Sequence, residues 1–121
     1  MVSDELVRNA GRAAALLDVL GNEKRFAIMC HLHEAELSVG AIAEKVSLSQ
    51  SALSQHLAKL RAMDLVQTRR DRQTIYYSCD SSAVEMLLQT MERLYGDGSE
   101  RRQGSNSTAN DRQADLPPRR P

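Results

Sequence analysis

Residues 48–60 read LSQSALSQHLAKL, and this stretch decides the fold. At 100° per residue, Leu53, Leu57 and Leu60 fall within about 60° of one another and form one apolar helix face. Ser49 is placed to cap the N-terminus of this helix. The opposite face carries small and hydrogen-bonding side chains: Ser51, Gln55, Ala58 and Ala62, with Ser54 and Lys59 on its flanks and Gln50 and His56 at its rims.

A shorter helix precedes this one. Ser38 is a candidate cap, and the apolar residues after it follow the helical spacing i, i+3, i+4 and i+7: Val39, Ile42, Ala43 and Val46. Ser47-Leu48-Ser49 then forms a tight break. Two short helices that meet at such a turn predict a helix-turn-helix.

Beyond the helix-turn-helix the apolar period changes to two. Residues 65–70 and 74–79 are rich in β-branched and aromatic side chains, and they flank the polar residues 71–73. This pattern predicts a β-hairpin, although its turn lacks glycine. A helix-turn-helix followed by a two-stranded wing is a winged helix-turn-helix.

Three further helices complete the predicted order, α-α-α-α-β-β-α. One apolar stripe predicts a first helix that ends near Leu20, before the stop residues Gly21-Asn22. A second helix is expected over about residues 23–34 and a last one over about 81–95. The fold class is therefore mainly α with a small two-stranded β wing.

The composition changes at Gly96. Residues 96–121 contain one large aliphatic residue, Leu116, so they are expected to form a disordered polar tail. This segment has five arginines and four acidic residues, so it is not expected to be a basic arm that binds DNA. The winged helix-turn-helix domain is therefore predicted to span residues 1–95.

Basic charge is concentrated locally. The whole chain has 16 basic and 16 acidic residues, but residues 59–72 hold five basic and two acidic ones. These charges are expected to contact DNA phosphates, while the small and amide side chains of the preceding helix contact base edges in the major groove. The alternative for the polar face is a merely solvated surface. The predicted phosphate contacts include Lys59, Arg61, Arg69, Arg70 and Arg72.

One module offers only three or four base-contacting side chains, so specific binding needs two half-sites and a symmetric dimer. The apolar stripes of the first and last helices exceed what a 95-residue domain easily buries, although packing within the monomer is an alternative. The predicted dimer interface consists of Leu6, Ala10, Ala13, Leu17, Leu87, Leu88, Met91 and Leu94.

The chain resembles the ArsR/SmtB family of winged-helix repressors in LGNEKR (20–25), ELSVGAIA (36–43), residues 48–60 and the wing around Arg69-Arg70 and Ile75-Tyr76-Tyr77. The resemblance implies a homodimer on imperfect inverted repeats of operator DNA, with the terminal helices at the interface. It is closest to a branch with a rhizobial repressor of nodulation genes. It implies base contacts from Gln50, Ser51, Ser54, Gln55 and His56, and wing contacts from Arg72 and its neighbours Gln73 and Thr74.

Many members of this family release DNA when they bind a metal. One family site has two cysteines where this chain has Ser38 and Gly40, and another uses a histidine in the last helix, which here has none. His31 and His33 point about 160° apart on a helix, so they are not expected to share a metal. No metal and no cofactor are expected.

Cys30 leaves one alternative open, because it matches a thiol of the redox-sensing branch of the family. The partner thiol expected late in the last helix is missing, and Cys79 is elsewhere, so a buried and inert Cys30 is the leading interpretation. A winged helix used for protein–protein contact is a third hypothesis. The sequence shows no Gly-rich phosphate loop, no nucleophile beside a base and no paired carboxylates, so nothing in it indicates an enzyme. The absence of a signal sequence and of an apolar span predicts a cytoplasmic protein.

Overall fold

Eight large apolar side chains, each at most 2% exposed, form the main core of the protein: Ile28, Met29, Leu32, Ile42, Leu53, Leu57, Leu60 and Val84. Most come from α3 (Glu23–Glu34), α4 (Val39–Val46) and α5 (Gln50–Ala62). The computed structural model describes residues 1–97. The chain divides after Val84 into two units. The apolar face predicted for α5 is confirmed.

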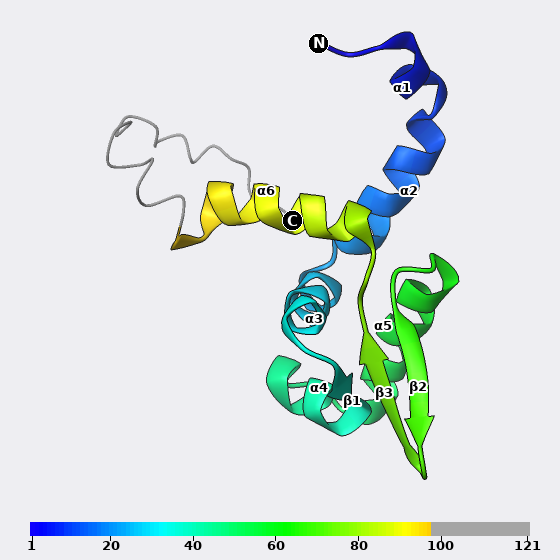
Figure 1. Cartoon of the computed structure of the whole chain (residues 1–121), viewed down its shortest axis with the longest axis vertical. Helices are drawn as coiled ribbons and strands as arrows, with labels where there is room; N and C mark the ends of the chain where they lie inside the picture. The colour runs from blue at the N-terminus through cyan, green and yellow to red at the C-terminus, as the bar shows by residue number, and fades with distance from the viewer. Residues whose placement is uncertain (98–121) are drawn as a thin grey trace. The chain divides into compact units, whose positions relative to one another are not determined.

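The helix-turn-helix is built from α4 and α5 (Figure 1). Ser38 and Ser49 cap these helices, because each hydroxyl accepts a 3.2 Å hydrogen bond from a backbone N–H of the first turn. Between them Ser47 is left-handed, with φ 57°, and the Leu48 amide donates to the Ala43 carbonyl at 3.0 Å. This Schellman-type ending of α4 makes the sharp turn that directs the chain into α5.

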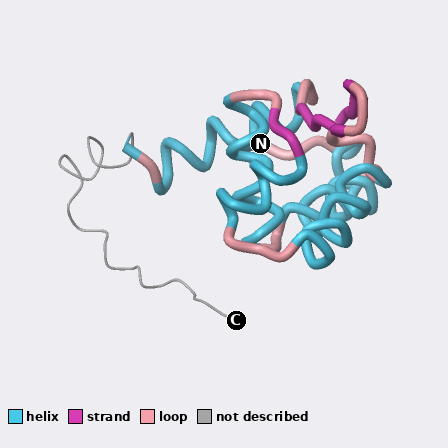
Figure 2. The backbone as a smooth tube through the Cα atoms, turned by 90° about the horizontal axis from the view of Figure 1, so that it is seen from below, coloured by secondary structure: helices cyan, strands magenta, loops and turns pink. Residues whose placement is uncertain are grey.

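The wing is a three-stranded antiparallel sheet of order β1-β3-β2, drawn in magenta in Figure 2. It consists of β1 (Leu37–Ser38), β2 (Gln67–Asp71) and β3 (Thr74–Ser78). The predicted hairpin of two strands is confirmed as β2 and β3. The third strand, β1, was not predicted, because it is only two residues long and shows no periodicity. The strand predicted over residues 65–70 begins later, as β2 at Gln67, since Leu65 and Val66 are buried core residues that precede it. The winged helix-turn-helix fold itself is confirmed.

The predicted single first helix is two helices, α1 (Asp4–Arg8) and α2 (Ala10–Leu20). Asn9 separates them: its φ and ψ are −96° and 17°, and its side-chain amide donates to the Glu5 carbonyl at 3.1 Å. Asparagine forms such local bonds to the backbone readily, which interrupts helices. The apolar stripe is therefore presented by two consecutive short helices.

The last helix, α6 (Ser82–Tyr95), starts in the first unit and continues in the second. The Ser81 hydroxyl accepts a hydrogen bond from the Val84 amide at 3.2 Å and so caps its first turn. The predicted tail lies outside the described residues from position 98 on, so the domain boundary remains a prediction. None of the helices described here is long and apolar enough to cross a membrane.

Candidate nucleic-acid interface

The exposed face of α5 carries most of the side chains predicted to contact bases. Gln50, Ser51, Ser54 and Gln55 are all exposed on this helix. No acidic residue lies in its first turn, and Lys59 and Arg61 lie in its last. The helix N-terminus has a partial positive charge, so both ends of this face favour a polyanion.

His56 differs from its neighbours on α5 because it is half-buried and has a partner from another helix. Its Nδ1 lies 3.3 Å from Nη1 of Arg25 on α3. Burial, and after it the charges of Arg25, Lys59 and Lys24, lower the pKa of His56. The imidazole is therefore neutral near pH 7. Sequence reasoning missed Arg25, which lies 31 residues away along the chain.

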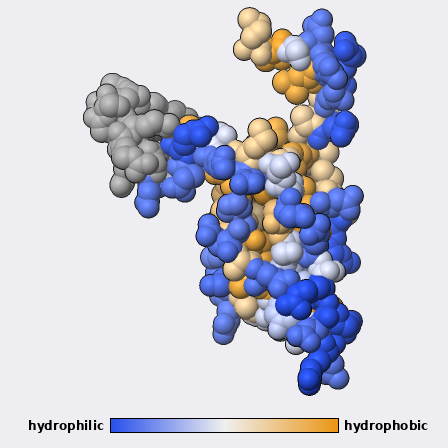
Figure 3. All heavy atoms as spheres, in the orientation of Figure 1, coloured by the Kyte–Doolittle hydropathy of each residue, from blue (hydrophilic) through white to orange (hydrophobic). Residues whose placement is uncertain are grey.

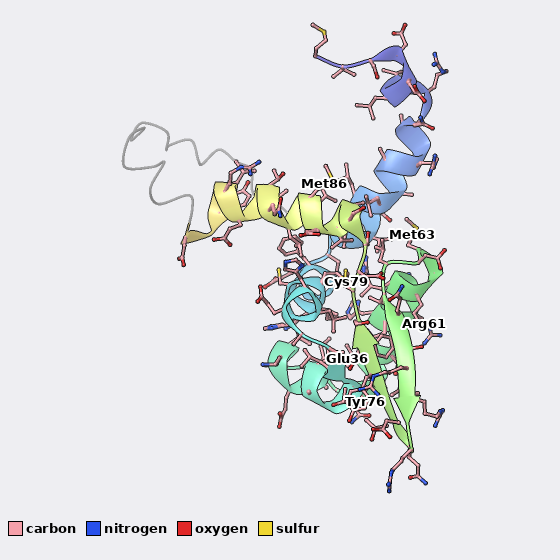
Figure 4. All side chains as sticks on the ribbon, in the orientation of Figure 1. Glu36, Arg61, Met63, Tyr76, Cys79 and Met86 are labelled. Carbon is pink, nitrogen blue, oxygen red and sulfur yellow. The ribbon has the colours of Figure 1, made fainter. Side chains whose placement is uncertain are left out.

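Arg69 of the wing is held by groups of the protein itself. Its guanidinium donates two 2.9 Å hydrogen bonds to the Glu36 carboxylate and lies over the Tyr76 ring, 4.6 Å from the centroid. Figure 4 shows Glu36 and Tyr76 in this part of the sheet. The hydrogen bond and the charge of Glu36 raise the pKa of Arg69. The pair neutralises one of the five predicted basic phosphate contacts, which the sequence analysis did not foresee.

The other basic side chains fall into two groups. Arg61 donates to the Tyr77 hydroxyl at 3.0 Å, which ties the end of α5 to β3 and leaves its charge unneutralised. Lys59, Arg70 and Arg72 are exposed and have no side-chain partner within residues 1–97. Gln73 and Thr74 are exposed beside Arg72, and Figure 3 shows the tip of the wing as strongly hydrophilic.

Arg72 occupies a left-handed backbone conformation, with φ 62°, at the tip of the hairpin. Glycine or asparagine adopts this conformation more easily than arginine, which is strained there by about 1–2 kcal/mol. Backbone strain of this kind is found preferentially at functional positions. The strain at Arg72 therefore favours a functional role for its side chain, because glycine or asparagine would form the same turn more easily.

The residues predicted to form the dimer interface are apolar or small, lie in both units, and are either exposed or half-buried. Leu6 and Leu17 are 50% and 57% exposed, and in the second unit Leu94 is 47% exposed. Five more large apolar side chains are exposed that were not predicted: Met1, Val2, Val7, Met86 and Tyr95. The remaining predicted residues are exposed or half-buried: Ala10, Ala13, Leu87, Leu88 and Met91.

No group of three or more His, Cys, Asp or Glu side chains in residues 1–97 is arranged to hold a metal ion. Cys30 on α3 and Cys79 after β3 are both half-buried, so Cys30 is less enclosed than an inert core thiol would be. Its predicted inertness stays a prediction.

The regulatory protein family described as "Bacterial regulatory protein, arsR family" matches residues 22–68, which run from the start of α3 into β2. Nodulation protein NolR of Rhizobium meliloti is 54% identical over 88 residues, which cover 73% of this chain and 72% of that protein. The chain belongs to the ArsR family. The family predicted from the sequence is therefore confirmed.

Other ArsR-type proteins agree with this assignment. Transcriptional activator HlyU of Vibrio cholerae is 45% identical over 91 residues, 75% of this chain and 84% of that protein. The crystal structure of NolR from Sinorhizobium fredii superposes with a TM-score of 0.72 at 51% identity, covering 79% of this chain and 96% of that one. A homodimeric winged helix-turn-helix DNA-binding domain from Mycobacterium bovis superposes with a TM-score of 0.63 at 26% identity, covering 78% of this chain and 91% of that one. These relatives are transcriptional regulators and not enzymes.

Proposed function

We propose that this ArsR-family chain is a homodimeric repressor that binds inverted-repeat operators in promoters. The observation that carries the proposal is the exposed face of α5, where Ser and Gln side chains stand beside a basic wing. Small residues let a helix approach the floor of the major groove, and a glutamine amide can pair with both N6 and N7 of adenine.

The base contacts come from the N-terminal half of α5: Gln50, Ser51, Ser54, Gln55 and His56. The contacts to the DNA backbone come mainly from Lys59, Arg70 and Arg72, which are exposed and have no side-chain partner within residues 1–97. Arg61 adds to them, and Gln73 and Thr74 can donate to phosphates beside Arg72. Arg69 contributes least, because Glu36 already holds its guanidinium.

Dimerisation buries the exposed apolar side chains of α1, α2 and α6. Leu17 of the first unit and Leu94 of the second are each about half exposed, and exposed apolar side chains of this kind favour burial against a second copy of the chain. The homodimeric relative from Mycobacterium bovis supports a dimer. Two α5 helices related by a two-fold axis would contact half-sites about one turn of DNA apart.

We expect nodulation-related genes among those that the protein regulates, because one relative is a nodulation protein. A regulator of promoter DNA works in the cytoplasm, and the proposed repression requires no metal or cofactor. A specific observation keeps a thiol-responsive regulator as the second candidate: Cys30 is half-buried, not sealed in the core.

Sequencing genomic fragments bound by the purified, reduced protein at about 150 mM salt tests the proposal. An inverted repeat with half-sites about 10 bp apart is expected. Lower transcription from a reporter carrying that repeat separates a repressor from an activator. Reversible loss of binding after peroxide treatment, absent in Cys30→Ser, would favour the thiol-responsive candidate. Fragments without any shared motif would contradict sequence-specific binding and favour a protein-interaction module.

A further inference from the structure

Arg25 contacts both α2, which is proposed to form part of the dimer interface, and α5, which is proposed to contact DNA bases. Its Nε donates a 2.6 Å hydrogen bond to the Val19 carbonyl near the end of α2, and its Nη1 lies 3.3 Å from Nδ1 of His56 on α5. Asn22 fixes the start of α3, because its side chain accepts a 3.0 Å hydrogen bond from the Arg25 amide. One half-buried guanidinium therefore contacts the helix of the proposed dimer interface and the proposed recognition helix.

The chemistry of this contact fixes the state of the imidazole. A guanidinium has only donors and stays protonated, so Nδ1 of His56 has to accept. A neutral imidazole with Nδ1 as acceptor carries its proton on Nε2. We propose that Arg25 is a positioning and specificity-determining residue that holds His56 as the Nε2–H tautomer, so that position 56 offers DNA a hydrogen-bond donor.

This state restricts what His56 can contact, an inference that rests on the proposed DNA-binding function. Nε2–H can donate to a phosphate oxygen or to the base acceptors of the major groove, which are guanine O6 and N7, adenine N7 and thymine O4. It cannot accept from the amino groups of adenine or cytosine. The other tautomer would reverse these preferences at the same position.

The charges around the ring support the neutral form. Arg25 and Lys24 act on it from α3, and Lys59 acts from α5 itself. Lys24 is held in place by a 2.8 Å hydrogen bond from its Nζ to the Val46 carbonyl. Protonation at Nδ1 would place an N–H against the Arg25 guanidinium, so it would break the contact between the two helices.

The decisive experiment is a long-range ¹H–¹⁵N NMR spectrum of the histidine rings in the full chain without DNA, assigned through His56→Gln. We expect Nε2–H for His56 in the wild type. Arg25→Met removes the donor, so the spectrum should move toward a mixture of tautomers. Lys24→Met removes a neighbouring charge but keeps the Arg25 contact, and its tautomer should be unchanged. A wild-type ring with its proton on Nδ1 would overturn the proposal, even if Arg25→Met failed to fold.

The consequence for specificity is tested separately by selection of bound duplexes from a randomised library. Arg25→Met should relax the preference at one base pair of each half-site, whereas Lys24→Met should keep it. Unchanged preferences in folded Arg25→Met would overturn the specificity role. If the wild type selects no sequence, the proposed function has failed, while the tautomer measurement on the DNA-free protein still decides whether Arg25 sets the state of His56.

Discussion

Arg69 on β2 forms a bidentate ion pair with Glu36, the residue before β1, and both N–O distances are 2.9 Å. The pair joins the outer strand of the wing to the segment that leads into the helix-turn-helix. Tyr76 on β3 is the cross-strand partner of Arg69 and lies beneath its guanidinium. A wing arginine therefore has a structural role in addition to its charge.

Glu36→Gln should strengthen binding to DNA of any sequence, because it releases the Arg69 charge beside the backbone. We expect a several-fold gain at low salt and a steeper dependence of log K on log[salt], by about 1–2 units for a dimer. Fluorescence anisotropy with a random duplex at several salt concentrations measures both. Glu34→Gln, a change of equal charge at an exposed end of α3, is the control. Equal effects of the two variants would show that only net charge matters.

Arg72→Gly separates backbone strain from side-chain charge at the wing tip. The hairpin should become more stable, by about 1 kcal/mol, because glycine adopts positive φ without strain. Binding to all duplexes should nevertheless weaken, since a phosphate contact is lost. Arg72→Lys, which keeps the charge, should retain most of the affinity. Thermal unfolding and anisotropy on the same samples test this, and unchanged affinity of Arg72→Gly would remove Arg72 from the interface.

Gln55→Ala should weaken binding to the selected operator by about 1–3 kcal/mol and leave binding to random DNA nearly unchanged. The physical reason is that a base-edge contact carries sequence information, whereas a phosphate contact does not. Gln89→Ala, an exposed glutamine on α6, is the matched control and should have no effect. Equal losses for Gln55→Ala on both kinds of DNA would exclude base recognition by this residue.

Stability should depend on pH through His56. Burial, then Arg25, Lys59 and Lys24, lower the pKa of His56 in the folded protein, while in the unfolded chain it is about 6.5. Between these two values the unfolded chain binds more protons. The free energy of unfolding should therefore decrease as pH falls below about 6.5 and be constant, for this group, above it. Urea titrations at about pH 7.5 and about pH 5 measure the change, which should be smaller in His56→Gln than in the wild type.

Leu17→Glu should give a monomer, because a carboxylate placed in an apolar interface loses its hydration. Leu94→Glu should do the same from α6. Sedimentation velocity measures the change. Arg12→Glu is the control, since this exposed residue of α2 lies on a different face from Leu17 and should leave the dimer intact. A dimeric Leu17→Glu would place the interface elsewhere.

The sequence was sufficient where local periodicity and capping decide the structure. Leu53, Leu57 and Leu60 revealed which face of α5 is buried, and Ser38 and Ser49 marked the starts of two helices. Asn9 shows the limit of this approach: the apolar stripe continues through it, but its side chain bonds to the backbone and divides the helix.

Features that depend on distant segments were not accessible. The strand β1 has two residues, and only pairing with Tyr76 and Tyr77 of β3 makes it a strand. Arg69 looked like another basic wing residue because Glu36 is 33 positions away. For the same reason Arg25 was not connected with His56. Each of these contacts requires the tertiary fold that brings the segments together.

The measurement that tests the central claim most directly is the ratio of affinities for the selected inverted repeat and for a scrambled duplex of the same composition. Native mass spectrometry of the complex gives the stoichiometry on the same sample. If α5 recognises bases as part of a homodimer, the ratio should be about 10³ or more at physiological salt, with two chains on each duplex. A ratio near one would exclude sequence recognition by α5, and a single chain on each duplex would exclude a homodimer on DNA.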